Sequence, residues 1–199
     1  NDLTSIWGTS ISAAIVSGLF STIVEEFGGY NSWNNSAGVD ALLAKSLMIM
    51  TATETNQPRV DDPKTEEINE SLLGPSLDRG TADDHEGFGR INPLAIFDLL
   101  NHEITPSQLS SVELQSSQDD PWGTHIFARN FTLEKNEIYL VNLTLDAGVD
   151  ADVFIYNQTP NDNGYPQLIS KSTQAGEGIN EIFHYNHITT LNPFIRFCI

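Results

Sequence analysis

The chain has 199 residues, of which 39% are hydrophobic and 9% aromatic, enough apolar material for one large or two small globular domains. Nine lysine and arginine residues stand against 27 aspartate and glutamate residues, and the formal net charge of -18 would repel a phosphate backbone, which argues against nucleic-acid binding. The single cysteine, Cys198, excludes an internal disulfide, no Cys/His spacing predicts a zinc site, and no apolar run approaches the roughly 20 residues of a membrane-spanning helix.

Three helices are predicted in the first half of the chain. Apolar or small side chains recur with helical spacing over residues 11–27 and end at a Gly-Gly pair, which predicts a buried helix. The same spacing predicts a second helix within residues 36–53. Asn92 is suited to be the N-cap of a third helix over residues 93–100, because Pro93 at the first helical position lacks only an N–H that the first turn leaves unpaired.

The second half changes to short runs of branched and aromatic residues separated by turn residues. This pattern predicts an all-β antiparallel sandwich. The expected strands are 111–116, 125–133, 137–145, 152–156, 167–172, 180–185 and 194–199. A Ser-, Gln- and Asp-rich link from residue 104 to 123 is the natural boundary, so we expect one domain over residues 1–103 and a second over residues 104–199.

One serine stands out in the segment 8-GTSISAAIVSG-18, where a loop gives way to a helix. The first N–H groups of a helix point outward with the positive end of its dipole, a setting that suits a developing oxyanion. Gly8 allows a tight backbone approach in front of Ser10. Because serine is also a preferred N-cap, these local residues alone favour a capping role for Ser10.

The wider pattern favours catalysis, because this segment resembles the nucleophile segment of subtilisin-like serine proteases, Gly-Thr-Ser-Met-Ala-x-Pro-x-Val-x-Gly. The matching residues are Gly8, Thr9, Ser10, Val16 and Gly18. Two further segments, 45-KSLMIMTAT-53 and 87-GFGRINPLAIFDLL-100, resemble that family in the same order. The resemblance covers most of residues 1–103. It implies the C-terminal part of an α/β parallel-sheet peptidase domain, with Ser10 as nucleophile and backbone oxyanion donor and with Gly8 and Thr9 shaping the turn.

The family resemblance also implies what this chain lacks. In subtilisin-like proteases the triad runs Asp, His, Ser along the chain, so the acid, the base and the side-chain oxyanion donor are expected upstream of Asn1. We therefore expect the C-terminal part of a larger serine endopeptidase, inactive alone, whose partners are protein or peptide substrates and its missing upstream part. Ala14 stands where the family has proline, which keeps a second interpretation open: a catalytically degenerate relative that binds or scaffolds.

The second half resembles the pre-peptidase C-terminal sandwich domains that follow many exported proteases. The resemblance rests on the strands within residues 125–157 and on 180-NEIFHY-185 and 194-FIRFCI-199. It implies an extracellular or cell-surface protein, and it leaves a third interpretation, an extracellular binding module. No cofactor is required. Asp150 and Asp152 are candidate calcium ligands, although alternating aspartates at a strand entrance are more often a solvated edge.

Overall fold

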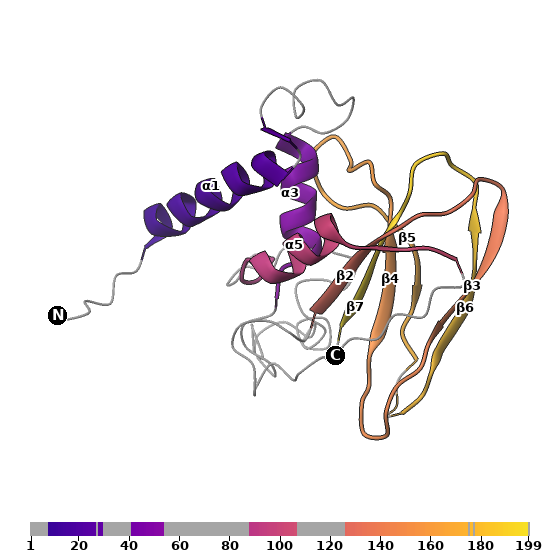
Figure 1. Ribbon diagram of the computed structural model, residues 1–199. Helices are drawn as coiled ribbons and strands as arrows, with labels where there is room; N and C mark the ends of the chain where they lie inside the picture. Colours follow the sequence, from indigo (N-terminus) through magenta and orange to yellow (C-terminus); the bar gives the residue numbers. More distant parts are fainter. Residues whose placement is uncertain are drawn as a thin grey trace. The chain divides into compact units, whose positions relative to one another are not determined.

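A computed structural model of the chain describes residues 8–26, 28–29, 41–53, 88–106, 126–174, 176 and 178–198 (Figure 1). These residues form helices and strands, so the fold is of mixed α and β type, as predicted at that level. The chain divides into two compact units, residues 1–40 and residues 41–199. The predicted strand over residues 111–116 lies outside the described residues.

Helix α1 (Thr9–Glu26) is the described helix of the first unit. Its bounds agree with the predicted helix, but the predicted burial is wrong for most of the apolar stripe. Ile15 is 56% exposed and Val16 is 39% exposed, whereas Leu19 and Ile23 are buried. A stripe on a helix is covered only where another layer of apolar side chains faces it, and periodicity alone does not show whether that layer is present.

Helices α3 (Ala41–Met50) and α5 (Pro93–Asn101) belong to the second unit. Helix α3 confirms the later part of the predicted second helix, whose first residues lie outside the described ranges. Helix α5 begins as predicted: the side-chain oxygen of Asn92 accepts a hydrogen bond from the backbone N–H of Ala95 at 3.0 Å, and Pro93 occupies the first turn. Capping and proline placement therefore identify this start correctly.

The described residues of the second unit form seven strands, and six of them were predicted. They are β1 (Glu103–Ile104), β2 (Ile126–Phe131), β3 (Glu137–Leu143), β4 (Asp152–Tyr156), β5 (Leu168–Ser172), β6 (Glu181–His187) and β7 (Phe194–Cys198). One sheet has the order β1-β2-β7-β4-β5, and a second sheet pairs β3 with β6. Every pairing among the six predicted strands is antiparallel, whereas the unpredicted β1 runs parallel to β2.

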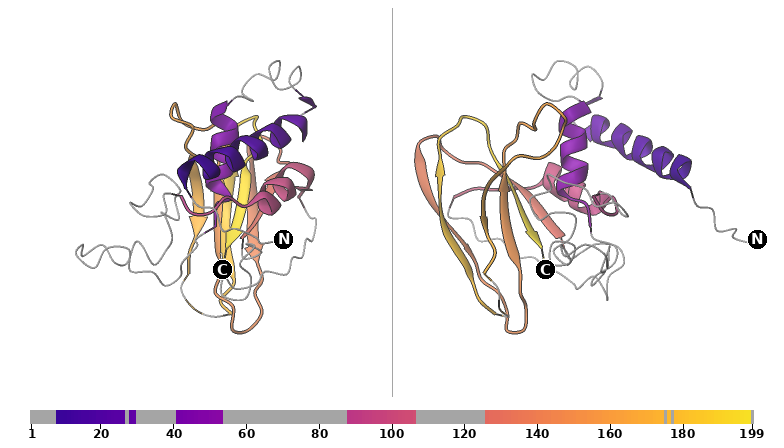
Figure 2. Two further views of the ribbon diagram at one scale, coloured as in Figure 1. Left: turned by 90° about the vertical axis from the view of Figure 1, so that its left-hand side faces the viewer. Right: turned by 180° about the vertical axis from the view of Figure 1, so that it is seen from behind.

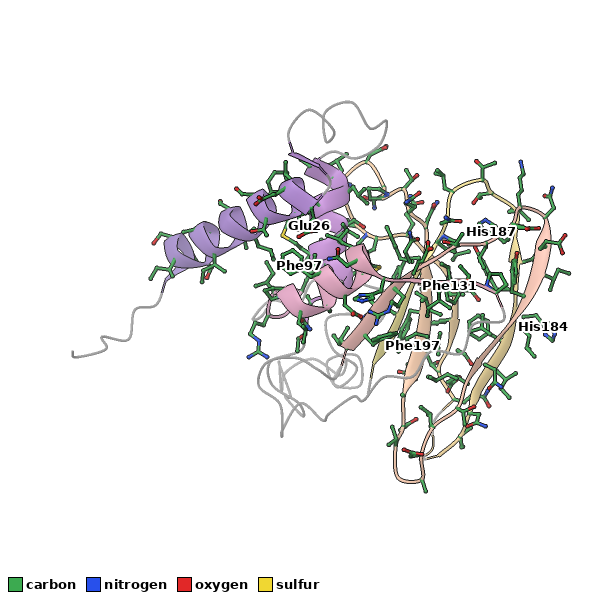
Figure 3. All side chains as sticks on the ribbon, viewed as in Figure 1. Glu26, Phe97, Phe131, His184, His187 and Phe197 are labelled. Carbon is green, nitrogen blue, oxygen red and sulfur yellow. The ribbon has the colours of Figure 1, made fainter. Side chains whose placement is uncertain are left out.

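The two sheets share one hydrophobic core. Its buried members come from both sheets: Phe127, Phe131, Val141, Val153, Ile155, Tyr185, Ile195 and Phe197. Figure 3 shows Phe131 and Phe197 between the sheets and His184 on the outer side of β6. Because side chains alternate along a strand, Val153 and Ile155 of β4 face this core while the residues between them face the opposite side of the five-stranded sheet.

That opposite side of the five-stranded sheet is also buried. Phe154 and Tyr156 of β4 are fully buried, and so is Ala128 of β2. Helices α3 and α5 lie on this side, away from β3 and β6 (Figure 2). The structure therefore draws no division at residue 103: the segments 41–53 and 88–106 share one compact unit with the strands, and the assignment of residues 1–103 to one domain and 104–199 to another stays a prediction.

Candidate functional site

Ser10 lies in the first turn of α1 and is not its N-cap. The helix begins at Thr9, and the carbonyl of Gly8 accepts the first hydrogen bonds, from the backbone N–H groups of Ile11 at 3.1 Å and Ser12 at 3.2 Å. The amide of Ser10 comes ahead of these bonds, among the groups that a helix start leaves without intrahelical acceptors. The Ser10 side chain is exposed. Capping, the role that local residues favoured, therefore falls to Gly8.

The backbone of Gly8, two residues before Ser10, has a positive φ. Its φ is +148°, in the region that residues with a side chain rarely adopt. A Cβ built on Gly8 would lie 4.0 Å from the Oγ of Ser10, so space is available and the backbone alone selects glycine. A side chain at Gly8 would therefore strain the backbone where the chain enters α1, and the role of Gly8 in shaping a catalytic turn stays a prediction.

Ala14, the departure from the subtilisin-like pattern, is an exposed residue of an unbroken helix. The hydroxyl of Ser17 donates to the carbonyl of Ala13 at 2.8 Å, and that of Ser21 donates to the carbonyl of Ser17 at 3.0 Å. Alanine retains the backbone N–H that proline would remove, so it introduces no kink at this turn.

No histidine occurs in residues 1–40, the unit that contains Ser10. Of the five histidines of the chain, His85 and His125 lie outside the described residues. His102 is exposed after α5, where its Nδ1 lies 3.4 Å from Oδ1 of Asp98. The other carboxylate oxygen of Asp98 forms an ion pair with Arg129 of β2.

The remaining two histidines lie on opposite faces of β6. His184 is exposed, whereas His187 is 1% exposed and its Nδ1 lies 3.3 Å from the hydroxyl of Tyr185. Burial lowers the pKa of His187 and raises the pKa of Tyr185, because the charged form of each group loses hydration. His187 Nε2 finds no hydrogen-bond partner within the described ranges. This pair is a feature of the core between the sheets.

The two later motifs of the subtilisin-like resemblance are joined in space. Thr53, which ends the first, forms an antiparallel β-bridge with Arg90 of the second, with N–H to carbonyl distances of 2.8 and 2.7 Å. The amide nitrogen of Asn92, 1% exposed, donates to the Thr53 hydroxyl at 3.0 Å while its oxygen caps α5. Asn92 therefore ties the end of the α3 segment to the start of α5.

The predicted calcium ligands lie beside a third carboxylate that sequence reasoning missed. Asp150 is exposed, and its Oδ2 accepts from the N–H of Gly176 at 3.3 Å. Glu181, at the start of β6, is fully buried. It accepts from the N–H of Gln174 at 2.7 Å and from the hydroxyl of Ser172.

The surroundings of Asp152 perturb its ionisation. The pKa of Asp152 is raised from 3.8 to about 6, chiefly because the side chain is partly buried and further because Asp150 and Glu181 are negatively charged nearby. The positive charges of Arg196 and Lys171 act in the opposite direction. Asp152 can therefore take up a proton near pH 6, which a solvated aspartate would not do. Within the described ranges, no group of three or more His, Cys, Asp or Glu side chains is arranged to hold a metal ion, and calcium binding stays a prediction.

Arg196 is the other buried charge that the sequence analysis passed over. It lies on β7, directly opposite Phe154 on one side and Ala128 on the other, and it is 2% exposed. Its guanidinium lies 5.3 Å from the centre of the Phe154 ring, and its Nε and Nη1 find no acceptor among the described residues. An arginine inside the apolar run 194-FIRFCI-199 was the available signal, because a strand that continues apolar on both sides of a charge is buried on both faces.

Comparison with known proteins adds no relative: no family model, no curated protein and no solved structure matches this chain. None of the helices in the described part of the chain is long and apolar enough to span a membrane.

Proposed function

We propose that this chain is the C-terminal part of a subtilisin-like serine endopeptidase and that Ser10 is its nucleophile. The observation that carries the proposal is the geometry of the α1 start. An exposed serine follows a glycine of positive φ, and its amide precedes the first intrahelical bonds of an 18-residue helix. In the proposed site, the Ser10 hydroxyl and the Ser10 amide act on one substrate carbonyl.

The reaction would be acyl transfer to Ser10. A histidine supplied by the upstream sequence accepts the Ser10 proton as Oγ attacks the peptide carbonyl, and the Ser10 amide donates to the resulting oxyanion. The histidine then passes the proton to the departing amine, which breaks the peptide bond and leaves an acyl-enzyme that water hydrolyses. The upstream aspartate orients the histidine. Without these groups the Ser10 hydroxyl is a weak nucleophile, so this chain alone should turn over little or no substrate.

Two features of the second unit support the same assignment. The bridge between Thr53 and Arg90 joins the two later segments of the subtilisin-like resemblance, and Asn92 links them through its buried side chain. The strands of β2 to β7 form two sheets with one core, which agrees with a pre-peptidase C-terminal-like sandwich following the peptidase part. A sandwich domain that follows a peptidase domain is typical of exported proteases, so we propose an extracellular or cell-surface location. Asp150 and Asp152 are the candidate calcium ligands.

Fluorophosphonate labelling tests the proposal. The protein is expressed from its complete open reading frame, matured, treated with the probe and digested, and the adduct is located by mass spectrometry. The same treatment is applied to residues 1–199 alone. Ser10→Ala removes the nucleophile, and Ser12→Ala is the matched control, because Ser12 is an exposed serine of the same helical turn.

The expected result is an adduct on Ser10 in the full-length protein, absent from Ser10→Ala, retained in Ser12→Ala and absent from residues 1–199 alone. A folded, matured full-length protein that stays unlabelled would contradict the catalytic proposal. Labelling of a different serine would leave a serine hydrolase but would remove Ser10 from its centre.

A second candidate function, binding without catalysis, is favoured by one surface. The outward positions of β3 and β6 include Ile138, Leu140 and Ile182, which are 66%, 59% and 48% exposed. Such a group of exposed aliphatic side chains suits an apolar binding partner. If the full-length protein is unlabelled, its binding to surfaces or polymers can be measured instead. Leu140→Asn and Ile182→Asn should then weaken the binding that the unaltered protein shows.

A further inference from the structure

We infer that the β-rich part of the chain is not a separable module but folds cooperatively with helices α3 and α5, which it binds through the loop of residues 157–166. The inference does not depend on the proposed function and holds whether or not Ser10 is a nucleophile. Two groups of contacts carry it, one made by this loop and one made by β1 and β2.

The loop contacts α3 at Gly164, a position that favours glycine. Lys45 of α3 donates from Nζ to the carbonyl of Asn163 at 2.8 Å and lies 4.4 Å from the centre of the Tyr165 ring. A Cβ built on Gly164 would lie 3.0 Å from Cδ of Lys45 and 3.2 Å from the carbonyl oxygen of Leu42. The φ of Gly164 is +77°. Backbone conformation and close approach to α3 therefore both disfavour a side chain at this position.

The loop holds its shape through its own hydrogen bonds. The side-chain oxygen of Asn161 accepts from the N–H groups of Asn163 and Tyr165, both at 2.9 Å. The backbone of Asn161 also exchanges hydrogen bonds with that of Tyr165 at 3.0 Å and of Gly164 at 2.8 Å. A loop fixed in this way loses little further conformational entropy when it contacts α3, so the contact contributes more to stability than one made by a freely moving loop.

The aromatic ring of Tyr165 extends the contact beyond α3. Its centre lies 5.6 Å from that of Phe88, in the segment that leads to the β-bridge at Arg90. Lys45 comes from the segment 41–53 and Phe88 from the segment 88–106, which together form the helical layer, and both residues contact Tyr165. Tyr165 therefore joins the two segments to each other as well as to the strands.

A second group of contacts connects α5 to β2. Asp98 of α5 forms an ion pair with Arg129 of β2. After α5 the chain continues directly into β1, which pairs parallel with β2, and the N–H of Thr132 donates to the carbonyl of Ile104 at 3.0 Å. The Thr132 hydroxyl donates to the carboxylate of Glu103 at 2.6 Å. The chain thus enters the sheet at residues 103–104, at the boundary predicted between the two domains.

The free energy that links the helices to the strands comes from burial of the sheet face opposite the shared core. Phe154 and Tyr156 are fully buried there, together with the guanidinium of Arg196. Burial of two aromatic side chains stabilises a structure by several kcal/mol in general, and that stabilisation is lost if the face becomes hydrated. Opening of the helical layer should therefore open the central strands with it, which is the property that defines one cooperative unit.

Hydrogen exchange of the intact chain, followed by mass spectrometry at increasing urea concentration, tests the inference. The amides of α3 and those of β4 should share one opening reaction and one urea dependence. Gly164→Ala should speed exchange of both elements by the same factor, on the order of tenfold or more. Gly148→Ala is the matched control: its φ of +89° imposes the same kind of backbone strain, but a Cβ at Gly148 meets nothing within 4 Å.

A second variant, with a smaller change to the structure, tests the inference if Gly164→Ala does not fold. Lys45→Met keeps the aliphatic stem and removes the bond to Asn163 and the charge over Tyr165, and it should speed exchange of α3 and β4 together by about tenfold. Lys135→Met, at an exposed turn between β2 and β3, is its control and should leave both elements unchanged. Faster exchange in α3 with β4 unchanged would overturn the inference, because the helices would then be a satellite of an autonomous sheet. Equal effects of Gly164→Ala and Gly148→Ala would also overturn it.

Discussion

Replacing Asp152 with asparagine should stabilise the protein above pH 6. The pKa of Asp152 is raised from 3.8 to about 6 by partial burial and by the charges of Asp150 and Glu181. A group whose folded-state pKa is raised favours folding when it is protonated. That favourable contribution is complete below pH 3.8, falls as the pH rises, and is lost above pH 6. Asparagine resembles the protonated carboxyl in shape and carries no charge, so it removes the unfavourable term at neutral pH.

The magnitude follows from the two pKa values. Their difference, at about 1.4 kcal/mol for each pKa unit, gives at most about 3 kcal/mol. Asp152 is only partly buried, so solvent screens part of this interaction, and we expect about 1 kcal/mol at pH 8. The gain should shrink through pH 6 and vanish near pH 4, where the carboxyl of the wild-type protein is already neutral.

Urea unfolding measured by far-UV circular dichroism at several pH values between 4 and 8 provides the assay, with the free energy of unfolding obtained by linear extrapolation. Asp162→Asn serves as control, because Asp162 is exposed and should show no such gain. A destabilising effect of Asp152→Asn at pH 8 would refute the reasoning, since it would mean that attraction to Arg196 outweighs desolvation and repulsion. A gain of equal size at pH 4 and pH 8 would also refute it, because titration could not be its cause.

Three further predictions concern separate parts of the chain. The lowered pKa of His187 means that its neutral form favours folding above pH 6.5 and that this contribution is lost as the pH falls. His187→Phe should therefore flatten the decline in unfolding free energy between pH 6.5 and pH 5, and an unchanged slope would exclude His187 as the cause of that decline. Asn92→Ala removes the cap of α5 and the bond to the Thr53 hydroxyl, and should lower the unfolding free energy by about 2 kcal/mol in the same urea assay; a loss below about 0.5 kcal/mol would contradict both roles. Gly8→Ala places a side chain on a residue whose φ is +148°, so amide hydrogen exchange in the first turn of α1, measured by NMR, should become about tenfold faster. Probe labelling of Ser10 in the full-length protein should also fall, and unchanged exchange would show that alanine tolerates this turn.

The local sequence determined which segments form helices and strands, because the signals for these are short-range. A short run of branched and aromatic residues placed β4 at Asp152–Tyr156 as predicted, and the Asn-Pro pair placed the start of α5. In both cases the deciding interaction lies within a few residues: an asparagine oxygen and an amide three positions later, or side chains on alternate faces of one strand.

For Ser10 the sequence located the candidate nucleophile, and the backbone decided only that this residue is not the N-cap of α1. Local residues favour a capping role for Ser10, whereas the hydrogen bonds to the Gly8 carbonyl place the cap two residues earlier. The position of the cap depends on the φ of Gly8, and glycine allows this φ without requiring it.

Tertiary structure alone decided which side chains are covered. The stripe on α1 has the spacing of a buried helix, yet Ile15 is exposed, and the charged Glu181 and Arg196 are buried in strands. Burial depends on what faces a side chain across the fold, often from more than a hundred positions away, as Lys45 meets Asn163. Such long-range contacts place the segments 41–53 and 88–106 in one compact unit with the strands, which no short-range signal in the linking segment could have revealed.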